Sequence, residues 1–313
     1  MIMHVVLSKE QVGGPIDASL QRACKKRDIG YHHFVVEDTL VDDIRTYRFR
    51  KGDLLYRVSQ SNLGEGLNDK SRAIESVAIA NNEGILTSMY YPSFVYPRSV
   101  LGSLADQFAS GIPVIPSAIM DVGWLNLSDE DLSARVQKLG GFPVVLKVLG
   151  FSRGQGVNLL HTLGDLKALM AKVLRPDAHV ILRKYVADYR HFRLVVVDDE
   201  VVAANEYIKP ENDFRTNFGT DIVTKSLDVS ELSQEIIRAS IAGVKLRASI
   251  LGGVDILIDT KTEQPFLAEV NVPCYFPRAE QVTGIDIAGK IVDAMVRQSQ
   301  KAISQAEDVQ SQQ

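Results

Sequence analysis

The clearest chemical pattern in the sequence is formed by two carboxylates and an amide near its C-terminal end. Asp255 lies in one apolar run, Glu269 and Asn271 lie in the next, and a polar turn around Thr262 separates the two runs. This order predicts a β-hairpin that places Asp255 opposite Glu269, where like charges repel. Asn271, two residues beyond Glu269, points to the same face. The trio therefore predicts a site for a hard divalent cation such as Mg²⁺, which prefers oxygen ligands. The alternative is a solvated strand face.

A second pattern follows Lys147, which ends an apolar run. The next loop, residues 150–156, holds three glycines and a serine, and a further apolar strand follows it. Glycine allows a backbone to approach a ligand closely, and successive N–H groups can bind an anion. The loop is not a Walker P-loop, because no Gly-Lys-Ser/Thr ends it and a strand follows in place of a helix. The pattern favours a flap over phosphates, with a plain glycine hairpin beside a solvent-directed lysine as the alternative.

A linker candidate divides the expected helices and strands into an N-terminal group and a longer group that follows it. Alternating strands and helices in residues 1–95 predict a small α/β domain with a parallel sheet, and residues 90–97 form the best linker candidate. The Gly13-Gly14 loop lacks the full dinucleotide-binding pattern, so we expect a plain strand-to-helix turn. Residues 298–313 are polar and are expected to fray. The expected strands are 5–7, 31–36, 53–58, 84–87, 143–148, 157–160, 180–184, 192–197 and 201–207, and the expected helices are 16–27, 70–82, 99–110, one between Ser128 and Gly140, 163–174, 231–246 and 285–297.

Composition narrows the classes of function. The chain has 313 residues, 45% of them hydrophobic and 24% charged, which is ordinary for a soluble globular protein. A formal charge of −4 argues against general nucleic-acid binding. Two distant cysteines, Cys24 and Cys274, predict neither a disulfide framework nor a zinc site and fit a reducing cytoplasm. No signal-peptide core and no apolar run of membrane-spanning length occur, so we expect a cytoplasmic protein without a membrane partner.

The ordered motifs after residue 142 resemble the ATP-grasp superfamily, and within it the RimK-like ligases, which join an amino acid to a peptide or small molecule. The matching stretches are residues 143–147, the glycine loop, 192–197 with 201–204, 213–217, 253–257, 269–271 and 283–288. The resemblance implies an α/β (α+β) ATP-grasp fold, in which two α+β subdomains hold ATP between them and a small α/β domain precedes them. The implied boundaries are 1–95 for the N-terminal domain, 96–182 for the subdomain with the glycine flap, 183–300 for the subdomain with the metal site, and 301–313 for a polar tail.

The resemblance also implies roles for individual residues. Asp255, Glu269 and Asn271 would hold Mg²⁺ or Mn²⁺. Arg193 and Arg215 would be catalytic, at the transferred phosphate or at a substrate carboxylate; a structural ion pair and a surface position are their respective alternatives. The residues implied to bind ATP are Lys147, Ser152, Arg153, Gly154 and Gly156 at the phosphates, Lys184, Tyr185 and Val186 at the adenine, Asp188 at the ribose, and Asn217. Arg57 is a candidate for the acceptor site. His191 is expected to be an ordinary strand-edge residue.

The implied function is an ATP-dependent carboxylate–amine ligase that forms an acyl phosphate and releases ADP and phosphate. Its substrates would be a small-molecule or peptide carboxylate and an amine, and the sequence is compatible with a homo-oligomer. The alternatives are a non-catalytic nucleotide-binding scaffold and an ATP-grasp kinase without ligation. Two departures from the family pattern favour the scaffold. Val100 stands where the relatives carry a lysine, although Arg98 lies nearby, and Arg183-Lys184 stands where an acidic residue precedes the hinge tyrosine.

Overall fold

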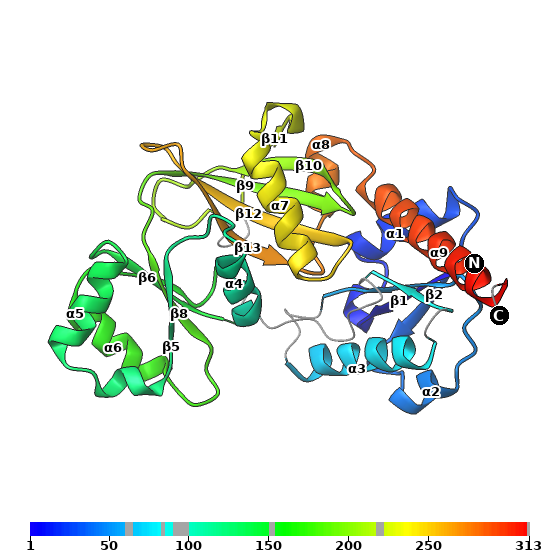
Figure 1. Ribbon diagram of the computed structural model, residues 1–313, viewed down its shortest axis with the longest axis horizontal. Helices are drawn as coiled ribbons and strands as arrows, with labels where there is room; N and C mark the ends of the chain where they lie inside the picture. The colour runs from blue at the N-terminus through cyan, green and yellow to red at the C-terminus, as the bar shows by residue number, and fades with distance from the viewer. Residues whose placement is uncertain (60–64, 83–84, 90–99, 150–153, 217–221, 312–313) are drawn as a thin grey trace.

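Three β-sheets divide the protein into three lobes, which Figure 1 shows side by side. The computed structural model describes residues 1–59, 65–82, 85–89, 100–149, 154–216 and 222–311. No helix within these ranges is both long enough and apolar enough to cross a bilayer.

The N-terminal lobe is a parallel four-stranded sheet with helices on both faces. Its order is β2-β1-β3-β4, from Gly30–Val35, Ile2–Leu7, Leu54–Arg57 and Thr87–Ser88. Helix α1 (Pro15–Lys25) covers one face, and α2 (Val41–Thr46) and α3 (Glu65–Asn81) cover the other. Strands buried on both faces need continuous apolar side chains, which is why β1 and β3 appear in the sequence as apolar runs. The predicted parallel α/β arrangement is confirmed.

The second lobe is an antiparallel sheet with two helices packed on it. The order is β5-β8-β6-β7, from Ser117–Met120, Val180–Lys184, Val144–Val148 and Val157–Leu160. Helices α5 (Asp129–Lys138) and α6 (Leu163–Val173) bury their apolar faces against it, and the short 3₁₀ helix Val122–Asn126 precedes α5. The side chain of Ser128 accepts a hydrogen bond from the backbone N–H of Asp131 and so caps α5, the helix predicted between Ser128 and Gly140. Lys147 lies on β6 near the glycine loop.

The third lobe is a five-stranded antiparallel sheet that carries most of the candidate site. Its order is β11-β10-β9-β12-β13, from Thr224–Leu227, Glu200–Tyr207, Tyr189–Val197, Leu251–Asp259 and Pro265–Asn271. Helix α7 (Gln234–Leu246), preceded by the 3₁₀ turn Val229–Glu231, packs on this sheet. Helix α4 (Val100–Ala109) lies between the second and third lobes in Figure 1 and contacts α7.

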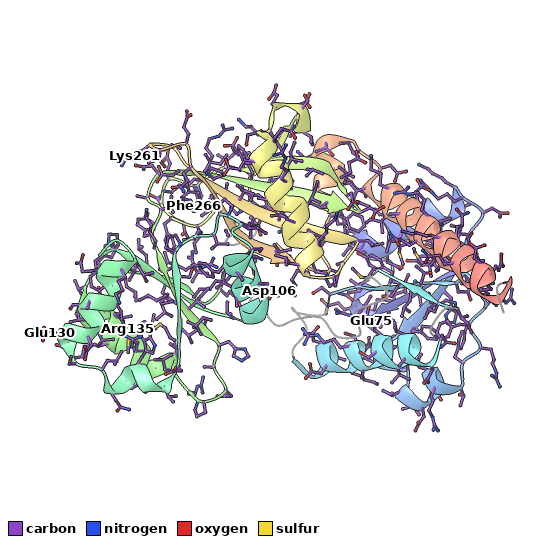
Figure 2. All side chains as sticks on the ribbon, in the orientation of Figure 1. Glu75, Asp106, Glu130, Arg135, Lys261 and Phe266 are labelled. Carbon is purple, nitrogen blue, oxygen red and sulfur yellow. The ribbon has the colours of Figure 1, made fainter. Side chains whose placement is uncertain are left out.

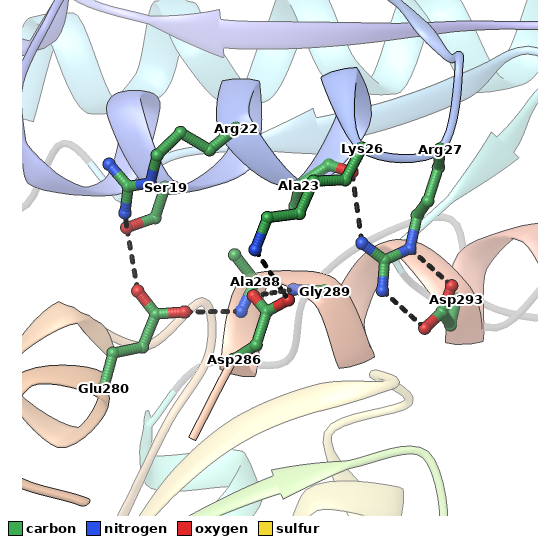
Figure 3. A network of polar contacts seen from close by, with 10 residues as sticks. All are labelled: Ser19, Arg22, Ala23, Lys26, Arg27, Glu280, Asp286, Ala288, Gly289 and Asp293. Atoms are coloured by element: carbon green, nitrogen blue, oxygen red, sulfur yellow. Dashed lines mark hydrogen bonds and ion pairs between the residues drawn. The ribbon is translucent and has the colours of Figure 1, made fainter. Parts of the chain in front are cut away.

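The C-terminal segment returns to the N-terminal lobe. Helices α8 (Pro277–Thr283) and α9 (Ile287–Ser311) pack beside α1, and one hydrophobic core joins residues of β1, β3 and α1 to residues of β9, β12 and α9. Figure 3 shows the polar contacts that border this core, including the pair Arg27–Asp293. The N-terminal and third lobes therefore share an interior.

The prediction that the C-terminal tail, residues 298–313, frays was wrong. Residues expected to fray continue α9 to Ser311. The hydroxyl of Ser299 donates to the carbonyl of Gly52 at 3.3 Å, and Lys51 pairs with Glu307 at 3.1 Å. These contacts with the N-terminal lobe hold a segment that lacks a clear apolar stripe. The expected helices and strands also did not include α2, β5, β11 and α8, which are short elements of four to seven residues.

Candidate functional site

The two acidic residues lie opposite each other, as the sequence predicts. Asp255 on β12 pairs in register with Glu269 on β13, and Gly253 pairs with Asn271. A β-bulge follows Asp255, where the register shifts before Ile256. The amide nitrogen of Asn271 donates to Oδ2 of Asp255 at 3.0 Å, which leaves its amide oxygen as the atom suited to bind a metal. The hairpin thus brings the predicted trio together.

Asp255 is buried among positively charged and polar partners. Arg193 Nη1 on neighbouring β9 donates to Oδ2 of Asp255 at 2.8 Å, and His191 Nε2 lies 3.1 Å from Oδ1. Burial raises the pKa of Asp255, but the charge of Arg193 and the contact with His191 outweigh burial, so the pKa lies below its ordinary value. Asp255 is therefore held as an anion, and its ion pair with Arg193 corresponds to the structural pair that the sequence left open as the alternative for that arginine.

Glu269 pairs with the lysine of the second lobe. Nζ of Lys147 lies 2.9 Å from Oε2 of Glu269, and the pair is about three-quarters buried, with side-chain exposures of 18% and 30%. This contact joins β6 of one sheet to β13 of another. A charge at the end of an apolar strand is costly unless it has a partner of opposite charge, and Glu269 is that partner for Lys147. Glu269 is also one of the predicted metal ligands.

A second link between the same two lobes comes from Arg183 on β8. Its Nη1 donates to the carbonyl of Ala268 at 2.8 Å and its Nε donates to Oγ of Ser117 at 2.9 Å. Burial lowers the pKa of Arg183 to about 10, with Glu269 acting in the opposite direction. Arg183, Lys147 and Glu269 line a small cavity of about 20 Å³ between the lobes, a volume close to that of one water molecule.

Arg215 connects the loop after β10 to the glycine loop. Its guanidinium forms a two-pronged ion pair with Asp213, with Nη2 2.8 Å from Oδ2, and Nη1 donates to the carbonyl of Gly154 at 3.1 Å. The carbonyl of Gly156 accepts from the N–H of Val148 at 2.9 Å, which continues the pairing of β6 with β7. Arg215 therefore lies beside Gly154, at the described end of the glycine loop.

His191 is not the ordinary edge residue that the sequence suggested. It is 5% exposed, and its ring lies between Oδ1 of Asp255 and the hydroxyl of Thr216, which its Nδ1 contacts. His191 lies two residues before Arg193, so both side chains point to the same face of β9. That period-two spacing is the signal that could have identified it.

The remaining candidates lie further from this cluster. Lys184, Tyr185 and Val186 follow one another at the end of β8, and Asp188 is exposed and pairs with Lys261 at 2.9 Å. Figure 2 shows Lys261 at the far tip of the β12–β13 hairpin. Ser152, Arg153, Asn217 and Arg98 lie outside the described residues.

Arg57 is buried in the N-terminal lobe. Its Nε donates to Oε2 of Glu75 at 2.7 Å, and Glu75 lies on α3, where Figure 2 labels it. Burial raises the pKa of Glu75, while the charge of Arg57 lowers it. This pair holds the acceptor-site candidate in the interior of the N-terminal lobe, at the end of β3.

The donor set fits a hard cation. Asp255, Glu269 and Asn271 offer two carboxylates and an amide oxygen, a set suited to Mg²⁺, and the cationic groups of Arg193 and Lys147 lie against the two carboxylates. Within the described ranges, no group of three His, Cys, Asp or Glu side chains is placed to hold a metal, so a metal here depends on the asparagine as a third ligand. Both cysteines are free and buried.

Comparison with known proteins agrees with this geometry. Over 172 residues the chain is 32% identical to a probable alpha-L-glutamate ligase of Enterobacter sp. (strain 638), covering 54% of this chain and 56% of that protein. It is 33% identical over 168 residues to the ribosomal protein bS6–L-glutamate ligase of Escherichia fergusonii, covering 53% of this chain and 54% of that protein. The match spans about half the length of each relative.

Solved structures share the fold over nearly the whole chain. The ATP-grasp ligase PsnB, in complex with a phosphomimetic variant of its minimal precursor, Mg and ADP, superposes with a TM-score of 0.70 at 17% identity and covers 95% of this chain and 98% of PsnB. Residues 117–295 match the model of the RimK-like ATP-grasp domain, which is more than half of the 313 residues. The fold is thus the ATP-grasp fold, and the chain belongs to the RimK-like ATP-grasp family.

Proposed function

We propose that the protein is an ATP-dependent carboxylate–amine ligase that forms an amide or peptide bond and releases ADP and phosphate. The observation that carries the proposal is the pairing of Asp255 with Glu269 across the β12–β13 hairpin, with Arg193 and Lys147 against these carboxylates. Two acids and two cations at one lobe boundary suit the binding and transfer of a phosphoryl group.

The reaction has two balanced steps. An oxygen of the substrate carboxylate attacks the γ-phosphorus of ATP, the bond from that phosphorus to the β–γ bridging oxygen breaks, and ADP leaves. An amine nitrogen then attacks the acyl carbon of the acyl phosphate, the bond from carbon to the phosphate oxygen breaks, phosphate leaves, and the nitrogen loses a proton. No side chain needs to become covalently attached to the substrate.

The roles of the charged residues follow from their contacts. Lys147 exchanges its contact with Glu269 for nucleotide phosphate, which its flexible side chain permits. Arg193, fixed by Asp255, directs its guanidinium at the transferred phosphate or the acyl phosphate; its Nε is buried without a hydrogen-bond partner among the described residues. Preorganised donors of this kind stabilise charge that develops in the transition state.

Asp255, Glu269 and Asn271 are the residues that would hold Mg²⁺ or Mn²⁺. The ion, when bound, neutralises charge on the phosphoryl oxygens and orients them. This assignment is supported by the hard oxygen donors of the trio and by the structure of PsnB, which was solved in complex with Mg and ADP. The guanidinium of Arg193 lowers the pKa of Asp255 and keeps it ionised, and Nζ of Lys147 lies 2.9 Å from Oε2 of Glu269, so each carboxylate has a cation against it.

The other nucleotide-binding assignments rest on the resemblance to the family. The loop with Ser152, Arg153, Gly154 and Gly156 closes over the phosphates and excludes water that would hydrolyse the acyl phosphate. Arg215 approaches this loop through Gly154 and is a second catalytic candidate. Lys184, Tyr185 and Val186 meet the adenine, Asp188 the ribose, and Asn217 the phosphate end.

We assign the substrates as an amino acid or peptide carboxylate and an amine. Relatives that match half of the chain are named as glutamate ligases, one of them acting on a ribosomal protein. Arg57, in the N-terminal lobe, is the candidate residue for binding the acceptor substrate.

The test is release of ADP. Purified protein with Mg-ATP and a panel of carboxylates and amines should release ADP and phosphate in amounts equal to the amide formed. AMP and pyrophosphate as products would contradict the acyl-phosphate mechanism. A stable phosphorylated product that needs no amine would identify a kinase, and nucleotide binding without any product would identify a scaffold.

A further inference from the structure

Four side chains form one row across the five-stranded sheet of the third lobe. Asn205 on β10 lies opposite Arg193 on β9, and Arg193 lies opposite Asp255 on β12. Asp255 in turn lies opposite Glu269 on β13. Opposed residues of antiparallel strands project from the same face of a sheet. Asn205 therefore stands beside Arg193 on the side away from the two acids, and the proposed function gives it no role so far.

Two N–H donors of this row lack a hydrogen-bond partner among the described residues. They are Nδ2 of Asn205 and Nε of Arg193, and both atoms are buried. The exposed fractions of the two residues are 1% and 9%. A buried donor that is left unpaired costs about 1–3 kcal/mol, and here two such donors belong to directly opposed residues. A fold that keeps both at one point of a sheet is suited to an acceptor that comes from outside the chain.

The surroundings of the two donors select an anion as that acceptor. Arg193 carries a full positive charge, and its Nη1 is engaged by Asp255 at 2.8 Å while its Nε is left over. Glu206, the acid that follows Asn205 in the chain, projects from the opposite face of β10 and pairs with Arg190 at 2.7 Å. The nearest carboxylate in sequence is thus directed away from the pair. An oxygen that carries negative charge is the ligand that forms the strongest hydrogen bonds with an amide N–H and a guanidinium N–H together.

We propose that Asn205 binds an oxygen of the transferred phosphoryl group, together with Nε of Arg193. The proposal rests on the proposed ligase function and adds one residue to its phosphate site. The candidate metal ligands approach the phosphoryl group from β12 and β13, and Asn205 approaches it from β10, so donors surround the group on both sides of Arg193. A ligand reaches so covered a pair when the chain over the row moves aside. At the other end of the row Lys147 is held by its ion pair with Glu269, which nucleotide phosphate can replace.

Asn205→Leu tests the proposal, because leucine has a similar volume and no donor. The variant should fold, since Nδ2 has no hydrogen bond within the described part of the fold to lose. Titration calorimetry measures inorganic phosphate on protein saturated with Mg-ADP, and separately Mg-ADP on the free protein. Loss of one hydrogen bond to a charged oxygen should weaken phosphate binding about 10-fold to 100-fold and leave Mg-ADP binding unchanged.

Ser240→Ala is the matched control. The hydroxyl of Ser240 is also buried without a hydrogen-bond partner in the ranges that the structure describes. It lies on α7, which packs on the opposite face of the same sheet, against Phe192 and Leu194. This variant likewise removes one unpaired polar atom from the third lobe, and it should bind phosphate and Mg-ADP like the wild type.

The outcomes separate the two claims. Failure of the wild type to bind Mg-ADP would overturn the proposed function and this inference with it. If the wild type binds Mg-ADP, the inference alone is overturned by absence of phosphate binding, by equal phosphate affinity in Asn205→Leu, or by an equal loss of affinity for phosphate and Mg-ADP.

A second variant covers the case in which circular dichroism shows that Asn205→Leu is unfolded. Asn205→Asp keeps the shape of the side chain and replaces the donor by a charged acceptor, which repels an anion. A loss of phosphate affinity with unchanged Mg-ADP affinity in this variant supports the inference, and unchanged phosphate affinity overturns it.

Discussion

Arg193 lies directly over Gly253, the residue two positions before Asp255 on the neighbouring strand. A Cβ atom built on Gly253 would stand 2.3 Å from Nη2 of Arg193 and 2.4 Å from its Cζ, closer than real contacts allow. The missing side chain at Gly253 is therefore what lets the guanidinium cross β12 and reach Asp255 at 2.8 Å.

Gly253→Ala should displace Arg193 and break its ion pair with Asp255. Because Asp255 would remain buried without its main cationic partner, we expect a loss of about 3–5 kcal/mol in the free energy of unfolding and a fall in turnover of about 100-fold. Urea unfolding and ADP release measure the two effects. Gly66→Ala, where an added methyl meets nothing within 4 Å on α3, is the control and should not reduce either quantity. Normal turnover in Gly253→Ala would mean that the position of Arg193 over the strand is unimportant.

Glu269→Gln tests the metal assignment without a change of side-chain volume. The variant should keep the fold, because glutamine fills the same space and its amide oxygen can still accept a hydrogen bond from Nζ of Lys147, so we expect a loss of about 1–3 kcal/mol in the free energy of unfolding. It should lose ADP release by at least about 1,000-fold, since a metal ligand with a full charge is replaced by a neutral amide. Circular dichroism and the ADP assay, run over a range of Mg²⁺ concentrations, check both parts. Turnover like that of the wild type would remove Glu269 from the site.

His191→Phe tests the link from Asp255 to the loop that carries Arg215. The phenyl ring fills the space but contacts neither Oδ1 of Asp255 nor the hydroxyl of Thr216, both of which His191 meets now. We expect turnover to fall by about 10-fold to 100-fold through loss of preorganisation, with a smaller effect on ADP binding measured without metal. His161→Phe, at an exposed position, serves as the control. An unchanged turnover number would show that His191 only fills the core.

The sequence was sufficient to predict the parts of the candidate site that arise from local sequence patterns. Two apolar runs on either side of the polar turn near Thr262 predicted the hairpin that pairs Asp255 with Glu269. The register near the turn differs by one residue from that at Asp255, because of a β-bulge that the sequence did not predict. The glycine residues around Lys147 likewise marked a loop between two strands, and β6 and β7 pair there.

Local sequence patterns could not predict the contacts between segments that are far apart in the chain. Lys147 and Glu269 are 122 positions apart, and no local pattern shows that β6 and β13 meet. His191 looked like an edge residue because its two partners lie 25 and 64 positions away. The end of α9 was missed for the same reason, since its ordering contacts are with Lys51 and Gly52 of the N-terminal lobe.

Two histidines of the N-terminal sheet should make stability fall in mild acid. His4 is fully buried and stacks on Phe34, and His32 packs edge-on against the same ring. Burial lowers the pKa of both, with Asp53 opposing the shift at His4. The folded pKa values therefore lie below the unfolded value of about 6.5, so the unfolded chain binds more protons and stability is lost as pH falls below that value.

The number of protons that the two histidines take up on unfolding sets an upper limit on how steeply the free energy of unfolding changes with pH. Each histidine can contribute up to about 1.4 kcal/mol per pH unit, so the free energy of unfolding should decline clearly between pH 7 and pH 5. His32→Phe should reduce the slope by up to one proton, whereas His161→Gln, at an exposed position, should preserve it. Urea unfolding at half-unit pH intervals measures the slope. A flat profile for the wild type across this range would contradict the prediction.

The pair Arg27–Asp293 should stabilise the contact between α1 and α9, which Figure 3 shows from close by. Nε and Nη2 of Arg27 lie 2.6 and 2.7 Å from the two oxygens of Asp293, and Nη1 donates to the carbonyl of Ala23 at 3.1 Å. Bidentate geometry favours the pair, but exposures of 24% and 48% screen it, so a double-mutant cycle with Arg27→Met and Asp293→Asn should give a coupling of about 1 kcal/mol that shrinks in high salt. The exposed pair Arg45–Asp42 within α2 should give a smaller coupling in the same cycle. Equal couplings for the two pairs would show that burial and the two-pronged geometry add nothing to the contact between α1 and α9.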